Sequence, residues 1–262
     1  MGPTAGRTAP ESWECDDVAT TYARYPFLVL VIALTLALVP GARAAVRVSQ
    51  FAVTPSTPQA GGHPTLTITT AFEPPSGDVK DFVLKLPRGL TANTGAAPYC
   101  PRKRLVADLC PSAAKVGSIA VAGEAFGFEA EVRRNIYNMR PAGSERLRLG
   151  ISVFGSLTTG GVAATLPVVE RPEGGLSIAV TGLPSDYNGI TVKVKRVQIK
   201  LKGQVRRKVG KGKRRRVRTR ALLTNPRTCE QATSALVLTT HETPPNTVTS
   251  FSSFFPTGCP VP

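Results

Sequence analysis

The residues best suited to do chemistry lie in one basic stretch, which includes "VRRKVGKGKRRRVRTR". Fifteen lysines and arginines and no acid occur between Lys193 and Arg220. So many like charges on neighbouring strands repel one another, which favours an anionic counter-surface. A solvated basic face that protects a sheet edge is the alternative. The candidate polyanion-binding residues are Arg206, Arg207, Lys208, Lys211, Lys213, Arg214, Arg215, Arg216, Arg218 and Arg220.

The positive charge is local. The whole chain has a net charge of +16, and residues 45–262 carry 30 basic and 13 acidic side chains. Without the stretch from 193 to 220, the net charge of residues 45–262 falls from +17 to +2. The stretch contains no Tyr, Phe or Trp on which a base could stack, so no sequence-specific nucleic-acid partner is expected. Any polyanion contact should weaken steeply with salt.

The residues for acid–base chemistry are few. The two histidines, His63 and His241, lie in "AGGHPT" and "TTHETPP". The chain has no Gly-x-Ser-x-Gly sequence and no phosphate-binding glycine loop. Glu129 and Glu131 share a strand face, but two solvated glutamates are a better interpretation than a glycosidase pair. We therefore expect a non-catalytic protein without a cofactor, and an extracellular hydrolase is the remote alternative.

Four cysteines remain after Cys15, and we expect them to form disulfides. Four cysteines allow three pairings, and closing the shortest loops favours Cys100 with Cys110 and Cys229 with Cys259. A zinc site is disfavoured because there is no Cys-x-x-Cys pair and both histidines are distant in sequence. Disulfides are typical of an oxidising compartment.

Short alternating segments that could position these residues fill the chain after residue 45. Examples are "TLTITTAF", "DFVLKL" and "ITVKVKRVQIKL", separated by Gly and Pro. This period of two predicts an all-β fold, either an antiparallel β-sandwich or an open barrel. Residues 192–222 are expected to project as a basic β-hairpin with a turn at Gly210 and Gly212. The alternation slips at Lys195-Arg196, which predicts a β-bulge. "RKRLVADL" is expected to make one or two helical turns.

The first 44 residues have the features of a signal peptide. Arg24 precedes a run of thirteen residues, 27–39, that is apolar except for Thr35, and Pro40-Gly41 and "ARA" follow. That apolar run fits a signal-peptide helix better than the roughly 20 residues of a membrane span, although an uncleaved membrane anchor remains an alternative. Cleavage is predicted between Ala44 and Ala45, leaving one domain, 45–262. The acidic extension before this segment is atypical, and translation from Val18 would remove it.

Several motifs together resemble a group of exported proteins from high-GC actinobacteria. The most specific are "STPQAGGHP", "GDVKDFVLKLPRGL" and "LLTNPRTC", and the resemblance covers most of residues 51–259. It implies export and a β-rich surface module, and it implies no activity. The expected role is structural or interactive, in the cell envelope or outside the cell. In a Gram-positive envelope, the polyanions available to the basic hairpin are teichoic-type polymers, anionic lipid headgroups and extracellular DNA.

Overall fold

The computed structural model describes most of the chain after residue 45. The described ranges are 46–73, 79–125, 127–154, 162–183, 193–209, 216–242 and 244–259. All of them belong to one compact unit, Ala44–Pro262. The predicted signal peptide, with its cleavage site at Ala44 and Ala45, lies outside the described residues. Within the described ranges, no helix combines the length and the apolar character needed to cross a membrane.

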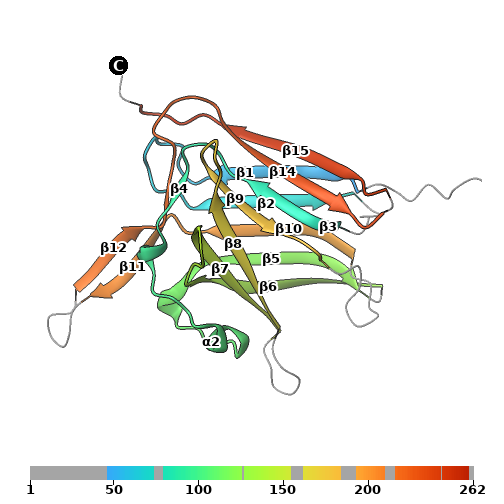
Figure 1. Cartoon of the computed structure of the whole chain (residues 1–262), viewed down its shortest axis with the longest axis horizontal. Helices are drawn as coiled ribbons and strands as arrows, with labels where there is room; N and C mark the ends of the chain where they lie inside the picture. The colour runs from blue at the N-terminus through green and yellow to red at the C-terminus, as the bar shows by residue number, and fades with distance from the viewer. Residues whose placement is uncertain are drawn as a thin grey trace, which may run out of the picture. The chain divides into compact units, whose positions relative to one another are not determined.

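Eleven strands form one antiparallel sheet, so the all-β prediction is confirmed (Figure 1). Each strand pairs with its neighbours in the sheet through an antiparallel ladder. In sheet order the strands are β1 (Val48–Pro55), β2 (Leu66–Phe72), β10 (Lys193–Leu201), β5 (Lys115–Ala125), β6 (Phe128–Met139), β7 (Glu145–Phe154), β8 (Val162–Glu170), β9 (Leu176–Val180), β3 (Val79–Lys85), β14 (Ala232–Thr240) and β15 (Thr247–Phe254).

The two outermost strands, β1 and β15, approach each other and nearly close the sheet into a barrel. The Val53 amide on β1 donates a hydrogen bond to Ser252 Oγ on β15, over 2.9 Å. Beyond the strand ends, the Thr257 amide donates to the Pro58 carbonyl oxygen, also over 2.9 Å. Isolated contacts of this kind replace a ladder along the seam between the two strands. Of the two predicted architectures, the structure is therefore the open barrel.

The alternation of apolar residues accounts for the core. On β2, the side chains of Leu66 and Ile68 are buried, while Thr67 between them is partly exposed. Leu84 and Leu86, which the sequence places on one face, are also buried. Each such leucine contributes about 2 kcal/mol when it leaves water. Burial of one strand face thus drives the chain to form the sheet.

A short excursion between β3 and β5 carries the predicted helical turns. It contains β4 (Thr91–Ala92), the 3₁₀ turns η2 (Thr94–Ala96) and η3 (Ser112–Ala114), and the helix α2 (Arg102–Val106). The disulfide between Cys100 and Cys110 joins the two ends of the α2 segment, and Leu105 is completely buried beneath it. Asn138 on β6 donates hydrogen bonds to the carbonyl oxygens of Thr94 and Ala97, over 2.9 and 2.8 Å. The excursion is therefore fastened to the barrel.

The basic region divides into two parts, which corrects the predicted hairpin at 192–222. Its first part, β10, lies inside the large sheet between β2 and β5, because Ile199 and Leu201 are buried in the core. The register of β10 against β5 shifts between Val194 and Arg196, which confirms the bulge. Only β11 (Gln204–Val209) and β12 (Arg216–Ala221) form the separate two-stranded antiparallel ribbon. We call the two strands β11 and β12 the ribbon.

A close backbone approach at Gly203 separates the two parts. A Cβ atom at this position would lie 2.1 Å from the His63 carbonyl oxygen, so only glycine fits. The Gly203 carbonyl oxygen accepts hydrogen bonds from the amides of Leu222 (2.8 Å) and Leu223 (3.2 Å). Leu223 begins β13 (Leu223–Thr224), which pairs with β4. The base of the ribbon is thereby fixed to the barrel, with Val205 buried at its root.

Candidate polyanion-binding ribbon

The register of the ribbon gathers arginines on one face. Arg207 on β11 stands directly opposite Arg218 on β12, and Val205 stands opposite Arg220. Because residues two apart on a strand point to the same side, these positions share a face. We call this the arginine face; its members are Arg207, Arg216, Arg218 and Arg220. The opposite face carries Arg206, which stands across from Thr219.

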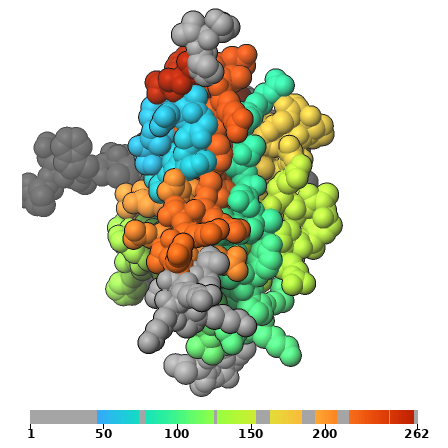
Figure 2. All heavy atoms as spheres, turned by 90° about the vertical axis from the view of Figure 1, so that its left-hand side faces the viewer, coloured from blue at the N-terminus to red at the C-terminus, as the bar shows by residue number. Residues whose placement is uncertain are grey.

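These five arginines are exposed and largely free of partners. In the described part of the chain, no carboxylate oxygen lies within 4.0 Å of any of their guanidinium groups. Arg220, at the root, contacts the carbonyl oxygen of Gly95 in η2 over 3.5 Å. Figure 2 views the molecule from this side, with the orange ribbon strands facing the reader. The arginine charges are therefore available to a ligand.

The remaining candidates from the sequence cannot be placed. Lys211, Lys213, Arg214 and Arg215 lie outside the described residues. The backbone of Lys208 belongs to β11, opposite Val217, and its side chain is also outside the description. Five of the ten predicted binding residues thus have described side chains, and all five lie on the ribbon.

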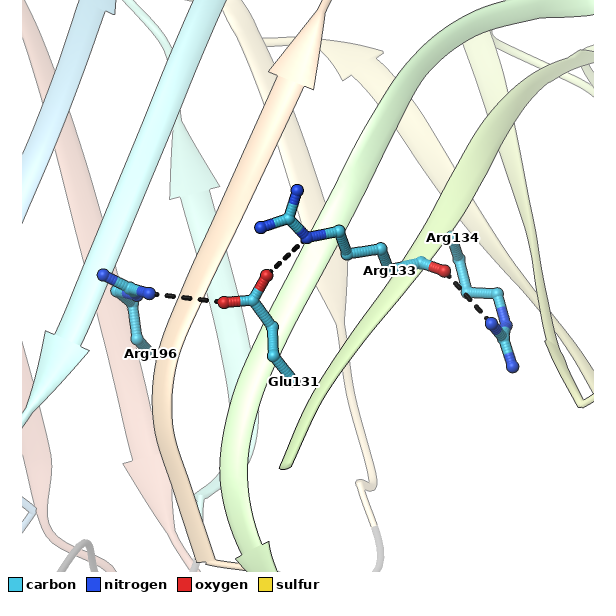
Figure 3. A network of polar contacts seen from close by, with 4 residues as sticks. All are labelled: Glu131, Arg133, Arg134 and Arg196. Carbon is cyan, nitrogen blue, oxygen red and sulfur yellow. Dashed lines mark hydrogen bonds and ion pairs between the residues drawn. The ribbon is translucent and has the colours of Figure 1, made fainter. Parts of the chain in front are cut away.

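Two cations of β10, Lys195 and Arg196, have a different environment. Lys195 forms ion pairs with Glu129 on β6 and with Glu124 on β5, the latter over 3.5 Å. Arg196 lies 3.3 Å from a carboxylate oxygen of Glu131. Glu131 also accepts a 2.5 Å hydrogen bond from Nε of Arg133, so it lies between two guanidinium groups (Figure 3). These cations have acidic partners within the fold.

The pKa values of the charged groups beside β10 follow from this pairing. The hydrogen bond from Lys195 lowers the pKa of Glu129, and the hydrogen bond from Arg133 is the main reason that the pKa of Glu131 is also lowered. The hydrogen bond to Glu129 in turn raises the pKa of Lys195. A glycosidase needs one carboxyl group with a raised pKa as its general acid. The two glutamates have the opposite shift and act as ion-pair partners.

A groove beside α2 adds three arginines that the sequence analysis missed. Its volume is about 570 Å³. Glu145 accepts hydrogen bonds from two guanidinium nitrogens of Arg148, over 2.7 and 2.5 Å, whereas Arg102 and Arg140 have no carboxylate partner among the described residues. The lining consists of Tyr99, Cys100, Pro101, Arg102, Met139, Arg140, Arg148 and Thr165. These residues come from separate segments, so the only local signal was the "RKR" sequence after Cys100.

The two histidines serve as hydrogen-bonding groups in different places. Nδ1 of His63 lies 3.2 Å from both the Leu223 carbonyl oxygen and Thr224 Oγ1. Nε2 of His241 lies 2.7 Å from the Leu183 carbonyl oxygen. Among the described residues, neither ring contacts a carboxylate, and the two rings bind different segments. Neither histidine has the carboxylate orienter of a catalytic triad in the described structure.

Both predicted disulfides are confirmed. The Cα atoms are 5.4 Å apart in Cys100–Cys110 and 5.9 Å apart in Cys229–Cys259, and the bonds indicate an oxidising environment. Among the described residues, no group of three or more His, Cys, Asp or Glu side chains is arranged to hold a metal ion. The fold and the site together define an all-β, disulfide-bonded module with an exposed cationic ribbon. Comparisons with protein families, with curated proteins and with solved structures gave no match.

Proposed function

We propose that this protein is a non-catalytic exported module of the cell envelope or the extracellular space, and that its ribbon binds anionic envelope polymers. The observation that carries the proposal is the unpaired arginine face. An arginine face without acidic partners repels itself, whereas a polyanion would neutralise it. The two disulfides and the predicted signal peptide support a location outside the cytosol. The resemblance to exported actinobacterial proteins agrees with that location.

The chemistry of the arginine face favours a phosphate or carboxylate polymer. A guanidinium group is always charged and donates two parallel hydrogen bonds to such anions. Along β12, Arg216, Arg218 and Arg220 recur about every 7 Å, because a strand advances about 3.4 Å per residue. A linear polymer with repeating charges can therefore contact several arginines at once. Teichoic-type polymers and anionic lipid headgroups both have this chemistry.

The experiment compares retention on purified cell-wall material at increasing salt. The test variant replaces the arginine face with glutamine: Arg207→Gln, Arg216→Gln, Arg218→Gln and Arg220→Gln. Each lost contact should reduce the slope of log affinity against log salt by about 0.7, so the full variant should lose a slope of about 3. Phosphate-rich wall polymer and anionic vesicles are tested separately to distinguish the two ligand sources.

A charge-matched control removes four exposed cations outside the ribbon: Lys85→Gln, Arg88→Gln, Lys200→Gln and Arg227→Gln. If only net charge matters, both variants lose retention equally and the ribbon has no special role. If neither variant changes retention, polyanion binding is excluded. An N-terminal peptide beginning at Ala45, recovered from the medium or the envelope fraction, tests the export part of the proposal.

A further inference from the structure

The groove beside α2 lies on the outer face of the sheet. On β7, Leu147, Leu149 and Ile151 are buried in the main core. Because side chains alternate along a strand, Arg148 and Gly150 between them belong to the opposite, outer face. The helix α2 contacts β7 and β8 on that face. The outer surface of these strands is therefore the floor of the groove.

The floor combines apolar atoms with one guanidinium group. Met139 on β6 stands directly opposite Arg148, and Thr165 on β8 stands directly opposite Gly150, so all four positions share the outer face. The side chain of Met139 is only 6 % exposed. A Cβ atom at Gly150 would lie 2.8 Å from Cγ of Met139, so the glycine makes room for the methionine on the sheet. The floor thus offers a thioether beside a cation.

The wall of the groove comes from the segment that leads into α2. Its position is fixed twice: Cys100 forms the disulfide with Cys110, and the Cys100 amide donates a 2.7 Å hydrogen bond to the Asn138 carbonyl oxygen. The side chain of Tyr99, next in the wall, is 37 % exposed. Arg102 completes the wall at the start of α2. An aromatic ring and a second guanidinium group are thereby held against the floor.

Two of the three arginines in the groove have no acidic partner. Glu145 accepts two hydrogen bonds from Arg148 and one from the Ala142 amide, over 3.0 Å. The hydrogen bond from Arg148 lowers the pKa of Glu145, so this pair stays ionised and is neutral as a whole. Arg102 and Arg140 contact no carboxylate among the described residues. The groove therefore has an uncompensated positive charge within about 570 Å³, a volume typical of ligand pockets.

We propose that this groove binds a small aromatic carboxylate. A guanidinium group donates parallel hydrogen bonds to a carboxylate, and Arg102 and Arg140 are the groups left to do so. The ring of Tyr99 and the sulfur of Met139 both make favourable contacts with an aromatic ring. A saturated body would fill the same space without those contacts. This site is separate from the ribbon, and its occupant is a small molecule, not a polymer.

Isothermal titration calorimetry of the full chain with naphthoate tests the proposal. Naphthoate should bind with a Kd below about 1 mM. Naphthylmethanol has the same ring without the charge and should bind at least about tenfold more weakly. Decahydronaphthoate keeps the charge but has no aromatic ring, and it should bind at least about threefold more weakly. The three probes thus separate the two halves of the recognition.

The test variant is the double substitution Arg102→Gln with Arg140→Gln, which should weaken naphthoate binding at least about tenfold. The matched control is Lys103→Gln with Arg104→Gln. It removes the same charge from exposed positions of α2 that do not line the groove, and it should keep the affinity within about twofold. Circular dichroism of each variant shows whether the barrel is intact.

Four results would overturn the proposal. They are no binding of naphthoate at millimolar concentration, equal binding of naphthylmethanol, equal binding of decahydronaphthoate, and equal losses in the test and control variants. The ribbon variant with four glutamines should bind naphthoate as the unmodified chain does. Failure of the groove and failure of polymer binding by the ribbon are therefore distinguished.

Discussion

Strand β10 and the ribbon are consecutive in the chain and similarly basic, yet two cations of β10 have acidic partners and the described arginines of the ribbon have none. On β10, Lys195 and Arg196 lie beside glutamates from β5 and β6. On the ribbon, Arg207 and Arg218 face each other, and the described structure places no acid near them. The topology makes this difference: β10 joins the large sheet, whereas β11 and β12 have only each other. A similar density of basic residues is thus partly neutralised by glutamates on β10, whereas the described arginines of the ribbon lack acidic partners.

The largest effect on stability is expected from Gly203→Ala. Gly203 lies between β10 and the ribbon, where the backbone passes close to another segment. The added Cβ would lie 2.1 and 2.3 Å from the carbonyl oxygens of His63 and Pro64. Backbone atoms cannot move aside as a flexible side chain does, so the substitution should lower the free energy of unfolding by about 3 kcal/mol. Urea denaturation measures this loss. Gly95→Ala is the control, because its nearest neighbour would lie at 3.4 Å and the cost should stay below about 1 kcal/mol.

This boundary also shows where sequence-based prediction stops. The strands, the bulge at Lys195-Arg196 and both disulfides depend on alternation and on short spacing, and they could be predicted. The break at Gly203, between β10 and the ribbon, depends on the close approach of the His63 carbonyl oxygen, which is 140 residues earlier in the chain. Nothing near Gly203 in sequence marks that contact, so the predicted hairpin began too early.

Only part of the candidate site could be predicted from the sequence. Five of the proposed binding arginines are on one exposed ribbon because they alternate within a single short segment. Their separation from β10 was not predictable, since the partners of Lys195 and Arg196 are glutamates more than sixty residues away, such as Glu129 and Glu131. The groove at Arg102 and Arg140 was missed for the same reason.

An intermediate effect on stability is expected from the double substitution Lys195→Gln with Arg196→Gln, which removes the two β10 cations that form ion pairs. The lowered pKa values of Glu129 and Glu131 mean that their ion pairs stabilise the fold fully above the unfolded pKa, near 4.5. That stability is lost as the pH falls through the lowered folded-state values. The variant should therefore be less stable than the unmodified chain at pH 7, and the two should converge once the pH lies below the lowered pKa values of Glu129 and Glu131. Urea denaturation at several pH values measures the convergence.

Two controls separate this effect from polyanion binding. Lys200→Gln removes an exposed β10 cation that stands opposite Thr67 and Ser118 and forms no ion pair among the described residues, so it should leave the pH profile unchanged. The double variant should also keep most of its retention on cell-wall material. A double variant that matches the unmodified chain in stability at pH 7 would show that these ion pairs contribute nothing, and the contrast between the two regions would fail.

The smallest effect is expected within the ribbon, from Arg207→Gln. Arg207 stands directly opposite Arg218, and like charges in that position destabilise a strand pair. Removing one charge should raise the free energy of unfolding by about 0.3 kcal/mol at low salt, and the gain should shrink at high salt because ions screen exposed charges. Arg206→Gln, opposite Thr219, lacks that repulsion and should show a smaller gain. Equal gains from both variants would mean that the stability of the ribbon depends on net charge alone. The pairing of Arg207 with Arg218 would then have no measurable effect on stability.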